Sequence, residues 1–205
     1  MNSRIVKLGL AAALATAFAV PVFAQSAAST AAPTASDVQR NVDQQQRIES
    51  GLKSGQLNTR EAGKLERGEA KVEKIEASAQ NNGTVSAREQ ARITAAQNRE
   101  SKAIYNQKHD AQVGNPGSAS SQRLQADVQR NVDQQQRIEQ GVRSGELKNG
   151  EVAKLERGQS RVDRATARAS ADGHVGAREQ ASLHARENRQ STRVYRKKHN
   201  AAVRG

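Results

Sequence analysis

The chain has 205 residues, with 33 Lys and Arg against 21 Asp and Glu, no Cys, no Trp, two Phe and two Tyr. This composition excludes a disulfide-stabilised scaffold and thiolate chemistry, and it disfavours an aromatic-rich α/β enzyme domain. Both phenylalanines lie within the first 24 residues, so Tyr105 and Tyr195 are the aromatic side chains left for a core if that segment is removed.

Residues 1–24 have the pattern of a Sec-type signal peptide. Arg4 and Lys7 precede an apolar run from Leu8 to Val20, and Val22-Phe23-Ala24 forms a loose small-x-small cleavage site. The run is shorter than the roughly 20 apolar residues of a membrane-spanning helix. We therefore expect cleavage after Ala24, no transmembrane segment afterwards, and a net charge of +10. The expected compartment is the periplasm, with secretion as the alternative.

The chain also contains an internal repeat with an offset of 90 residues. Residues 37–49 and 127–139 both read DVQRNVDQQQRIE. Alignment of 37–110 with 127–200 gives 40 identities in 74 positions without a gap. This pattern predicts two similar units along the chain.

Small and polar residues precede each copy of the repeat. Residues 25–36 and residues 111–126 are rich in Ser, Ala and Gln and include Pro, a composition typical of flexible linkers. The predicted organisation is thus a first unit at 37–110 and a second unit at 127–205, which ends in a basic tail.

Each unit is predicted to contain three helices and no strand. In the first unit, apolar residues recur at helical spacing from about Asp37 to Ser54. Asn58-x-x-Glu61 and Ser86-x-x-Glu89 are capping boxes that open the second and third helices, and the third helix runs to about Lys108. The predicted fold class is all-α: a tandem duplication of a three-helix unit joined by a flexible linker.

The predicted core of the first unit is small. Twelve large apolar side chains are available in 74 residues, which leaves little stability after the entropy of ordering the chain. They are Val38, Val42, Ile48, Leu52, Leu57, Leu65, Val72, Ile75, Val85, Ile93, Ile104 and Tyr105. We therefore expect help from ion pairs, a partner or self-association into a homo-oligomer.

Acidic residues of the second helix interleave with basic ones. Glu66, Glu69, Glu73 and Glu76 alternate with Lys64, Arg67, Lys71 and Lys74. This pattern indicates a solvated face of ion pairs, not a pair of carboxyl groups poised for acid–base catalysis.

The sequence lacks the motifs of catalysis and cofactor binding. There is no nucleophile triad, phosphate-binding loop or dinucleotide fingerprint. No His or Cys spacing provides a zinc ligand set, and His174 and His184 replace Thr84 and Thr94 of the first unit. The sequence predicts a protein that is not an enzyme, with no catalytic residues, metal ligands or cofactor.

The turns between the predicted helices resemble the second half of an EF-hand loop. Gly55-x-Leu57-x-x-x-Glu61 and Gly83-x-Val85-x-x-x-Glu89 recur 90 residues later, at Gly145 and Gly173. The first half of the loop lacks its carboxylates, and Arg168 stands where one belongs. A turn that ends one helix at a glycine, followed by a glutamate that caps the next helix, accounts for this sequence motif. Calcium binding is the alternative.

Tyr105-x-x-Lys108-His109 recurs as Tyr195-x-x-Lys198-His199. Residues four apart share a helix face, so each Tyr–His pair is either a ligand-binding pair or a packing pair. The favoured interpretation places the tyrosine in the core with its hydroxyl at the rim.

Positive charge is concentrated near the end of the second unit. Residues 127–200 carry 16 basic and 10 acidic side chains, against 13 and 11 in residues 37–110. The candidate anion-binding residues are Arg186, Arg189, Arg193, Arg196, Lys197 and Lys198. Such a stripe suits phosphates at an envelope surface. Nucleic acid is not expected, because Tyr195 alone offers a stacking surface and an exported protein does not meet the genome.

The repeated residues are QQQRI-x-x-G-x-x-SG-x-L-x-x-x-E-x-x-KLERG, followed by G-x-V-x-AREQA and NR-x-S-x-x-x-Y-x-x-KH. They resemble small exported helical repeat proteins of unknown function from Gram-negative bacteria, and the resemblance implies no activity. The favoured function is binding of a protein partner or an anionic envelope component through the basic helix face. The alternative is a periplasmic calcium-binding protein, and an inert structural or stress-response protein is the third hypothesis.

Overall fold

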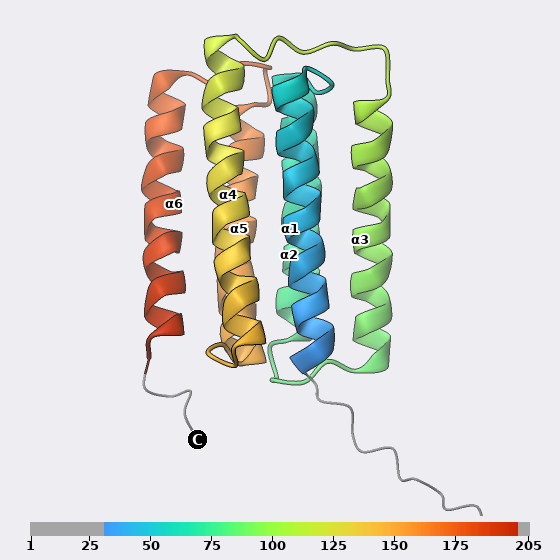
Figure 1. The fold of residues 1–205 in the computed structure, drawn as a ribbon, viewed down its shortest axis with the longest axis vertical. Helices are drawn as coiled ribbons and strands as arrows, with labels where there is room; N and C mark the ends of the chain where they lie inside the picture. Colours follow the sequence, from blue (N-terminus) through green and yellow to red (C-terminus); the bar gives the residue numbers. More distant parts are fainter. Residues whose placement is uncertain (1–30, 201–205) are drawn as a thin grey trace, which may run out of the picture.

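The computed structural model describes residues 31–200, and the side chains of residues 34–200. These residues form six α-helices and no strand: α1 (Ala31–Ser54), α2 (Thr59–Ala79), α3 (Ala87–Lys108), α4 (Ala119–Arg143), α5 (Asn149–Ala169) and α6 (Ala177–Lys198) (Figure 1). The all-α prediction is confirmed for this part of the chain. The expected signal peptide at 1–24 and the first six residues of the expected linker at 25–36 lie outside the described residues.

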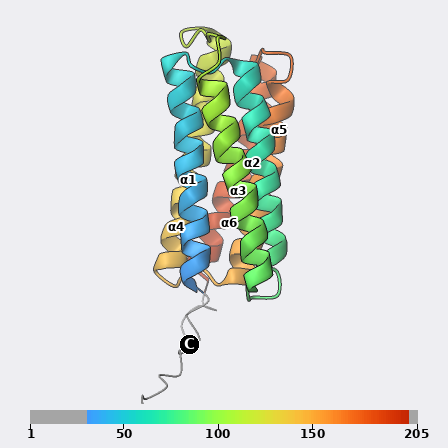
Figure 2. The ribbon, with the colours of Figure 1, turned by 90° about the vertical axis from the view of Figure 1, so that its right-hand side faces the viewer.

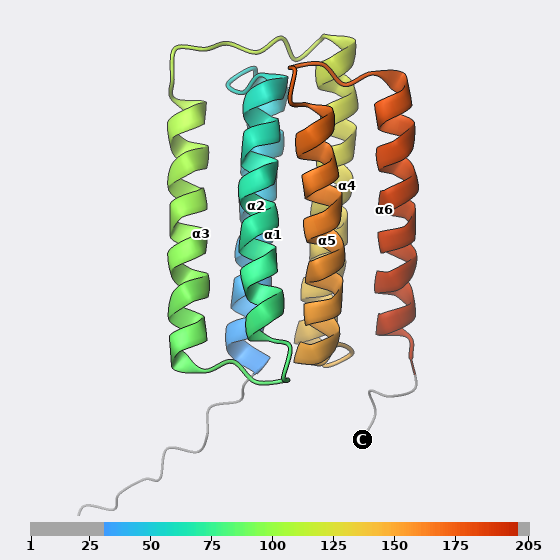
Figure 3. The same cartoon turned by 180° about the vertical axis from the view of Figure 1, so that it is seen from behind.

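Four helices form the centre of the bundle, and one helix flanks each side. α1 and α4 lie side by side on the front face, and α2 and α5 lie side by side on the back (Figures 1 and 3). The most extensive helix packing joins α2 to α5 and α1 to α4. α3 covers the α1–α2 pair (Figure 2), and α6 covers the α4–α5 pair. Helices that are 90 residues apart in the sequence therefore pack directly against each other.

Apolar side chains gather in two separate clusters, and each cluster takes residues from both halves of the chain. One cluster contains Ile48, Leu52, Leu57, Ala62, Leu65 and Ile104, together with Leu124, Val128 and Val175 from the second half. The other contains Ile138, Val142, Leu147, Val152, Leu155 and Val194, together with Val38 of α1. Neither half closes its own apolar cluster.

The predicted flexible linker at 111–126 is wrong for much of its length. α4 begins at Ala119, where the Ser118 hydroxyl accepts a 3.1 Å hydrogen bond from the backbone N–H of Ser121. Leu124 is fully buried in the first apolar cluster, which explains why the helix extends this far towards its N-terminus. The preceding loop is also attached, because the backbone N–H of Gly114 donates to the carbonyl of Gly55 at 2.8 Å.

The expected linker at 25–36 is likewise wrong at its end. Residues 31–36 belong to α1. Thr34 is fully buried, and its hydroxyl lies 3.1 Å from Oδ1 of Asn149, the first residue of α5.

Nine of the twelve predicted core residues of the first unit are buried, whereas Ile75 and Val85 are half-buried. Tyr105 is 57% exposed and Tyr195 is 63% exposed, so their placement in the core is wrong. α3 turns Ile93, Gln97 and Ile104 towards α1 and α2. One residue further along a helix points about 100° away, and Tyr105 therefore faces solvent.

Candidate functional sites

The basic residues expected on α6 fall into two groups. Arg186, Arg189 and Arg193 are exposed, and with Arg161 of α5 they line a groove of about 130 Å³ between the two helices. No carboxylate lines this groove. Within residues 34–200, none of these four guanidinium groups lies within 4.0 Å of a carboxylate oxygen. We call Arg161, Arg186, Arg189 and Arg193 the arginine groove.

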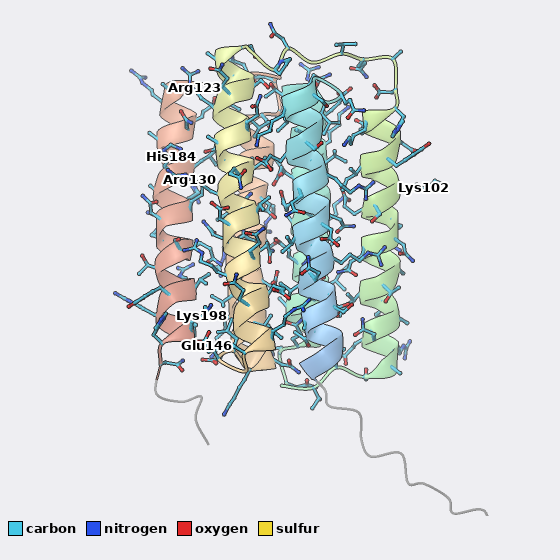
Figure 4. The ribbon with its side chains drawn as sticks, in the orientation of Figure 1. Lys102, Arg123, Arg130, Glu146, His184 and Lys198 are labelled. Carbon is cyan, nitrogen blue, oxygen red and sulfur yellow. The ribbon has the colours of Figure 1, made fainter. Side chains whose placement is uncertain are left out.

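The two lysines of the expected stripe lie elsewhere. Lys197 Nζ is 3.3 Å from Glu151 Oε1, and Lys198 Nζ is 3.4 Å from Glu146 Oε2. Both lysines are half-buried, and Figure 4 shows Lys198 beside Glu146 near the end of α6. Arg196 is exposed but does not line the arginine groove. The structure thus places Lys197 and Lys198 in ion pairs that fasten the end of α6 to the start of α5 and the turn before it.

Each Tyr–His pair forms an aromatic stack on the surface. The ring centroids are 4.1 Å apart for Tyr105 and His109, and 4.2 Å apart for Tyr195 and His199. Nδ1 of each histidine lies 2.7 or 2.8 Å from the backbone carbonyl of the same tyrosine. Each histidine therefore packs on the tyrosine one turn before it, and among residues 34–200 neither His109 nor His199 belongs to a group of three potential metal ligands.

The turns that resemble an EF-hand loop use their glutamates to cap helices. Glu61 Oε2 accepts from the backbone N–H of Asn58 at 2.9 Å, and Glu89 Oε2 accepts from that of Ser86 at 2.9 Å. Glu179 makes the same contact with Gly176 at 2.8 Å. The preceding glycines have φ values of 75° to 90°, the left-handed conformation that ends a helix. These carboxylates already have a structural role in each turn.

The acidic residues of α2 are the largest departure from the sequence expectation. Glu66, Glu69, Glu73 and Glu76 are each at most 1% exposed, whereas the sequence indicated a solvated face. The basic residues between them, Lys64, Arg67, Lys71 and Lys74, are the exposed ones. The four glutamates are spaced three, four and three residues apart, so they share one face of α2, and the hydrogen-bond partners of Glu66, Glu73 and Glu76 come from α1, α3 and α4. That face is acidic and points inward.

Amide side chains surround these buried carboxyl groups. Asn41 Nδ2 donates to Glu76 Oε2 at 2.6 Å, and Gln97 Nε2 donates to Glu76 Oε1 at 2.8 Å. Gln135 of α4 donates to Glu73 Oε1 at 2.7 Å, across the two halves of the chain. The centre of the bundle is therefore a hydrogen-bonded polar layer between the two apolar clusters.

The buried carboxyl groups hold protons more tightly than ordinary ones. Burial raises the pKa of Glu156 to about 8 and that of Asp163 to about 7. Burial raises the pKa of Glu69 well above its usual value, and the carboxylates of Glu100 and Glu66 add to this effect. Among the described residues, both carboxyl oxygens of Glu69 lack a hydrogen-bond partner, and no Lys or Arg forms an ion pair with them. Burial thus favours the protonated, uncharged form of the carboxyl groups in the polar layer.

A second cluster of ionisable groups lies between α4 and α6. One ligand-type atom from each of Asp127, His184 and Glu187 lies within 4.8 Å of the others. Asp127 and Glu187 are fully buried, and the His184 side chain is 34% exposed. His184 and the neighbouring Arg130 lie together at this position in Figure 4. We call Asp127, His184 and Glu187 the α4–α6 cluster.

Neither buried cluster was predicted from the sequence. Two signals were present: the seven-residue step of the α2 glutamates, from 66 to 73 and from 69 to 76, which equals the step from Leu65 to Val72, and the His184-x-x-Glu187 spacing on one helix face. The third member, Asp127, could not be joined to them from the sequence, because it lies 57 residues before His184.

Comparison with protein-family models, curated proteins and solved structures finds no match to this chain. None of the helices within residues 31–200 has the length and apolar character needed to span a membrane.

Proposed function

We propose that this protein is a non-enzymatic, exported helical protein that binds phosphate groups of envelope lipids through the arginine groove. The observation that carries the proposal is the convergence of Arg161, Arg186, Arg189 and Arg193 on one groove that contains no carboxylate. A guanidinium group matches a phosphate bidentately, and several of them around a shallow groove suit a phosphorylated headgroup.

The burial of acidic side chains strengthens this argument. Five of the ten acidic residues in 127–200 are buried: Asp127, Glu139, Glu156, Asp163 and Glu187. The surface of this half is consequently more basic than its composition implies. Long-range attraction to an anionic membrane surface depends on exposed charge, so the folded protein favours such binding more than its net charge indicates.

We further propose that the chain is a fused internal dimer, made of two copies of one three-helix unit. The 90-residue repeat and the exchange of Val38 and Leu124 between the apolar clusters support this arrangement. The calcium alternative is less well supported, because the glutamates of the turns cap helices.

The test uses co-sedimentation with vesicles of phosphatidylglycerol and phosphatidylcholine, compared with phosphatidylcholine alone. Replacement of the four groove arginines by Gln should lower binding to the anionic vesicles at least tenfold. A matched control replaces four exposed basic residues outside the groove: Lys53, Lys64, Arg88 and Lys102. It removes the same charge and should lower binding much less.

Equal losses in the two variants would show that net charge alone drives binding, and would overturn a groove-specific site. Wild-type binding should also fall steeply with salt. Millimolar inorganic phosphate should compete for the groove, whereas the same concentration of chloride should not. If wild-type protein ignores anionic vesicles altogether, the proposed function is wrong and a protein partner becomes the hypothesis to pursue.

A further inference from the structure

We propose that Asp127, His184 and Glu187 bind one divalent transition-metal ion of the zinc class, in a site open to solvent on the His184 side. The proposal does not depend on the arginine groove. It rests on the geometry of the α4–α6 cluster, on the absence of hydrogen-bond partners for its ligand atoms among the described residues, and on a comparison with the corresponding place in the first half of the chain.

The geometry fits a metal ion. Nε2 of His184 lies 3.3 Å from Oδ1 of Asp127. Two ligands of a tetrahedral ion with bonds of 2.0–2.1 Å are separated by roughly 3.4 Å. Glu187 completes a set of three atoms within 4.8 Å, and the partial exposure of His184 leaves room for water as a fourth ligand.

The ligand atoms have no other hydrogen-bond partner among the described residues. Both carboxyl oxygens of Asp127, both of Glu187 and Nε2 of His184 are buried without a hydrogen bond. Nε2 of His184 and Oδ1 of Asp127 thus face each other at a distance that a shared metal ion would span.

At the corresponding position in the first half of the chain, the carboxylate has a hydrogen-bond partner. The residues 90 positions earlier are Asp37, Thr94 and Gln97. Nε2 of Gln90 donates to Asp37 Oδ1 at 2.9 Å, so an amide satisfies this carboxylate. The second half keeps this glutamine as Gln180, yet both oxygens of Asp127 lack a hydrogen-bond partner among the described residues. It also replaces Gln97 by the carboxylate of Glu187 and Thr94 by the imidazole of His184, which adds two potential metal ligands.

One neighbouring group competes with the ion. Arg130 Nη1 lies 3.5 Å from Glu187 Oε2, and its side chain is 43% exposed. The guanidinium can therefore move into solvent when a metal neutralises Glu187. The ligand set of one imidazole and two carboxylates favours zinc, cobalt or nickel over calcium, which needs six to eight oxygen ligands.

The experiment measures binding of Zn²⁺ by calorimetry and of Co²⁺ by visible absorption, in purified protein without a histidine tag. We expect one ion per chain and the intense visible bands of a low-coordinate cobalt site. The double variant H184T/E187Q, which reproduces the residues of the first half, should bind at least 100-fold more weakly. The reciprocal variant T94H/Q97E should bind a second ion, because Asp37 then gains the same two partners.

Further variants separate loss of the site from loss of the fold and from surface binding. Circular dichroism should show unchanged helicity in H184T/E187Q, and H184Q tests the half-exposed ligand alone if the double variant unfolds. H109Q/H199Q removes both stacked histidines and should retain the site. Unchanged affinity in H184T/E187Q and H184Q, or no stoichiometric binding by the wild-type protein, would overturn the proposal.

Discussion

The side-chain amide of Gln135 on α4 donates a 2.7 Å hydrogen bond to Oε1 of Glu73 on α2. The two residues are 62 positions apart and belong to different halves of the chain. This bond lies in the polar layer between the apolar clusters, where a shift of one helix along another would leave buried polar atoms unpaired. The polar layer consequently fixes how the halves align, while the apolar clusters supply the burial of hydrocarbon.

The polar layer predicts an unusual dependence of stability on pH. In the unfolded chain its carboxyl groups ionise near pH 4, whereas in the folded protein Asp163 titrates at about 7 and Glu156 at about 8. Between these values the folded state binds more protons than the unfolded state. The free energy of unfolding should therefore fall as the pH rises from about 4 to 9, by about 1.4 kcal/mol in total for each unit by which burial raises a pKa.

Urea unfolding followed by circular dichroism at pH 5, 7 and 9 measures this dependence. A chelator should be present, so that metal ions do not take the place of protons. Below about pH 4 the carboxyl groups are protonated in both states, and this contribution should no longer change. Stability that rises between pH 5 and pH 9 would contradict the buried, protonated carboxyl groups described here.

Replacement of Glu69 by Gln should stabilise the protein at pH 8. The corresponding residue of the second half is Gln159, which is also fully buried, so the site can hold an amide. The variant replaces a buried carboxyl group that has no hydrogen-bond partner by an amide. The amide can donate to Glu66 or Glu100, whose negative charges raise the pKa of Glu69. We expect a gain of about 1–3 kcal/mol at pH 8 and a smaller gain at pH 5. D133N, at an exposed carboxylate, should change stability by less than about 0.5 kcal/mol.

Leu124→Ala tests the tertiary role of the segment that the sequence marks as a linker. Leu124 is fully buried among residues of the first half, and its truncation should cost about 2–5 kcal/mol. V113A lies in the same segment, at a side chain that is 83% exposed, and should have almost no effect. Similar unfolding free energies for the two variants would mean that the 119–126 segment does not pack as described.

Separated halves should not fold as monomers. A fragment of residues 31–113 loses Leu124, Val128 and Val175 from its apolar cluster and exposes the face of α2 that packs on α5. We expect low helicity at micromolar concentration, and a gain in helicity when this fragment is mixed with residues 114–205. Analytical ultracentrifugation would detect the complex. A monomeric fragment with a cooperative thermal transition would argue against the shared clusters.

The helices were predictable because their signals are local. Asn58 and Glu61 form the predicted capping box, as do Ser86 and Glu89. Gly55 and Gly83 adopt the expected left-handed conformation, with φ of 77° and 87°. Each of these features depends on residues fewer than five positions apart, whose geometry the backbone itself imposes.

The candidate sites were predictable only in part. The sequence identified Arg186, Arg189 and Arg193 as basic residues on one helix, but Arg161 joins them from α5, and the lysines 197 and 198 turn towards carboxylates. The sequence gives the spacing of ligands on one helix. It does not give the distance between Asp127 and His184, which depends on how α6 packs against α4.

The sequence by itself determined the number of helices between residues 31 and 200, their caps, and the 90-residue repeat, because periodicity and capping are properties of short segments. Tertiary structure decided which face of each helix is inside. Leu65 and Glu69 lie one turn apart on one face of α2, and a charged residue on such a face looks exposed until another helix covers it. The packing of α2 against the surrounding helices buries that face and raises the pKa of its carboxyl groups, so an apparently solvated row of acids becomes part of the polar centre of the bundle.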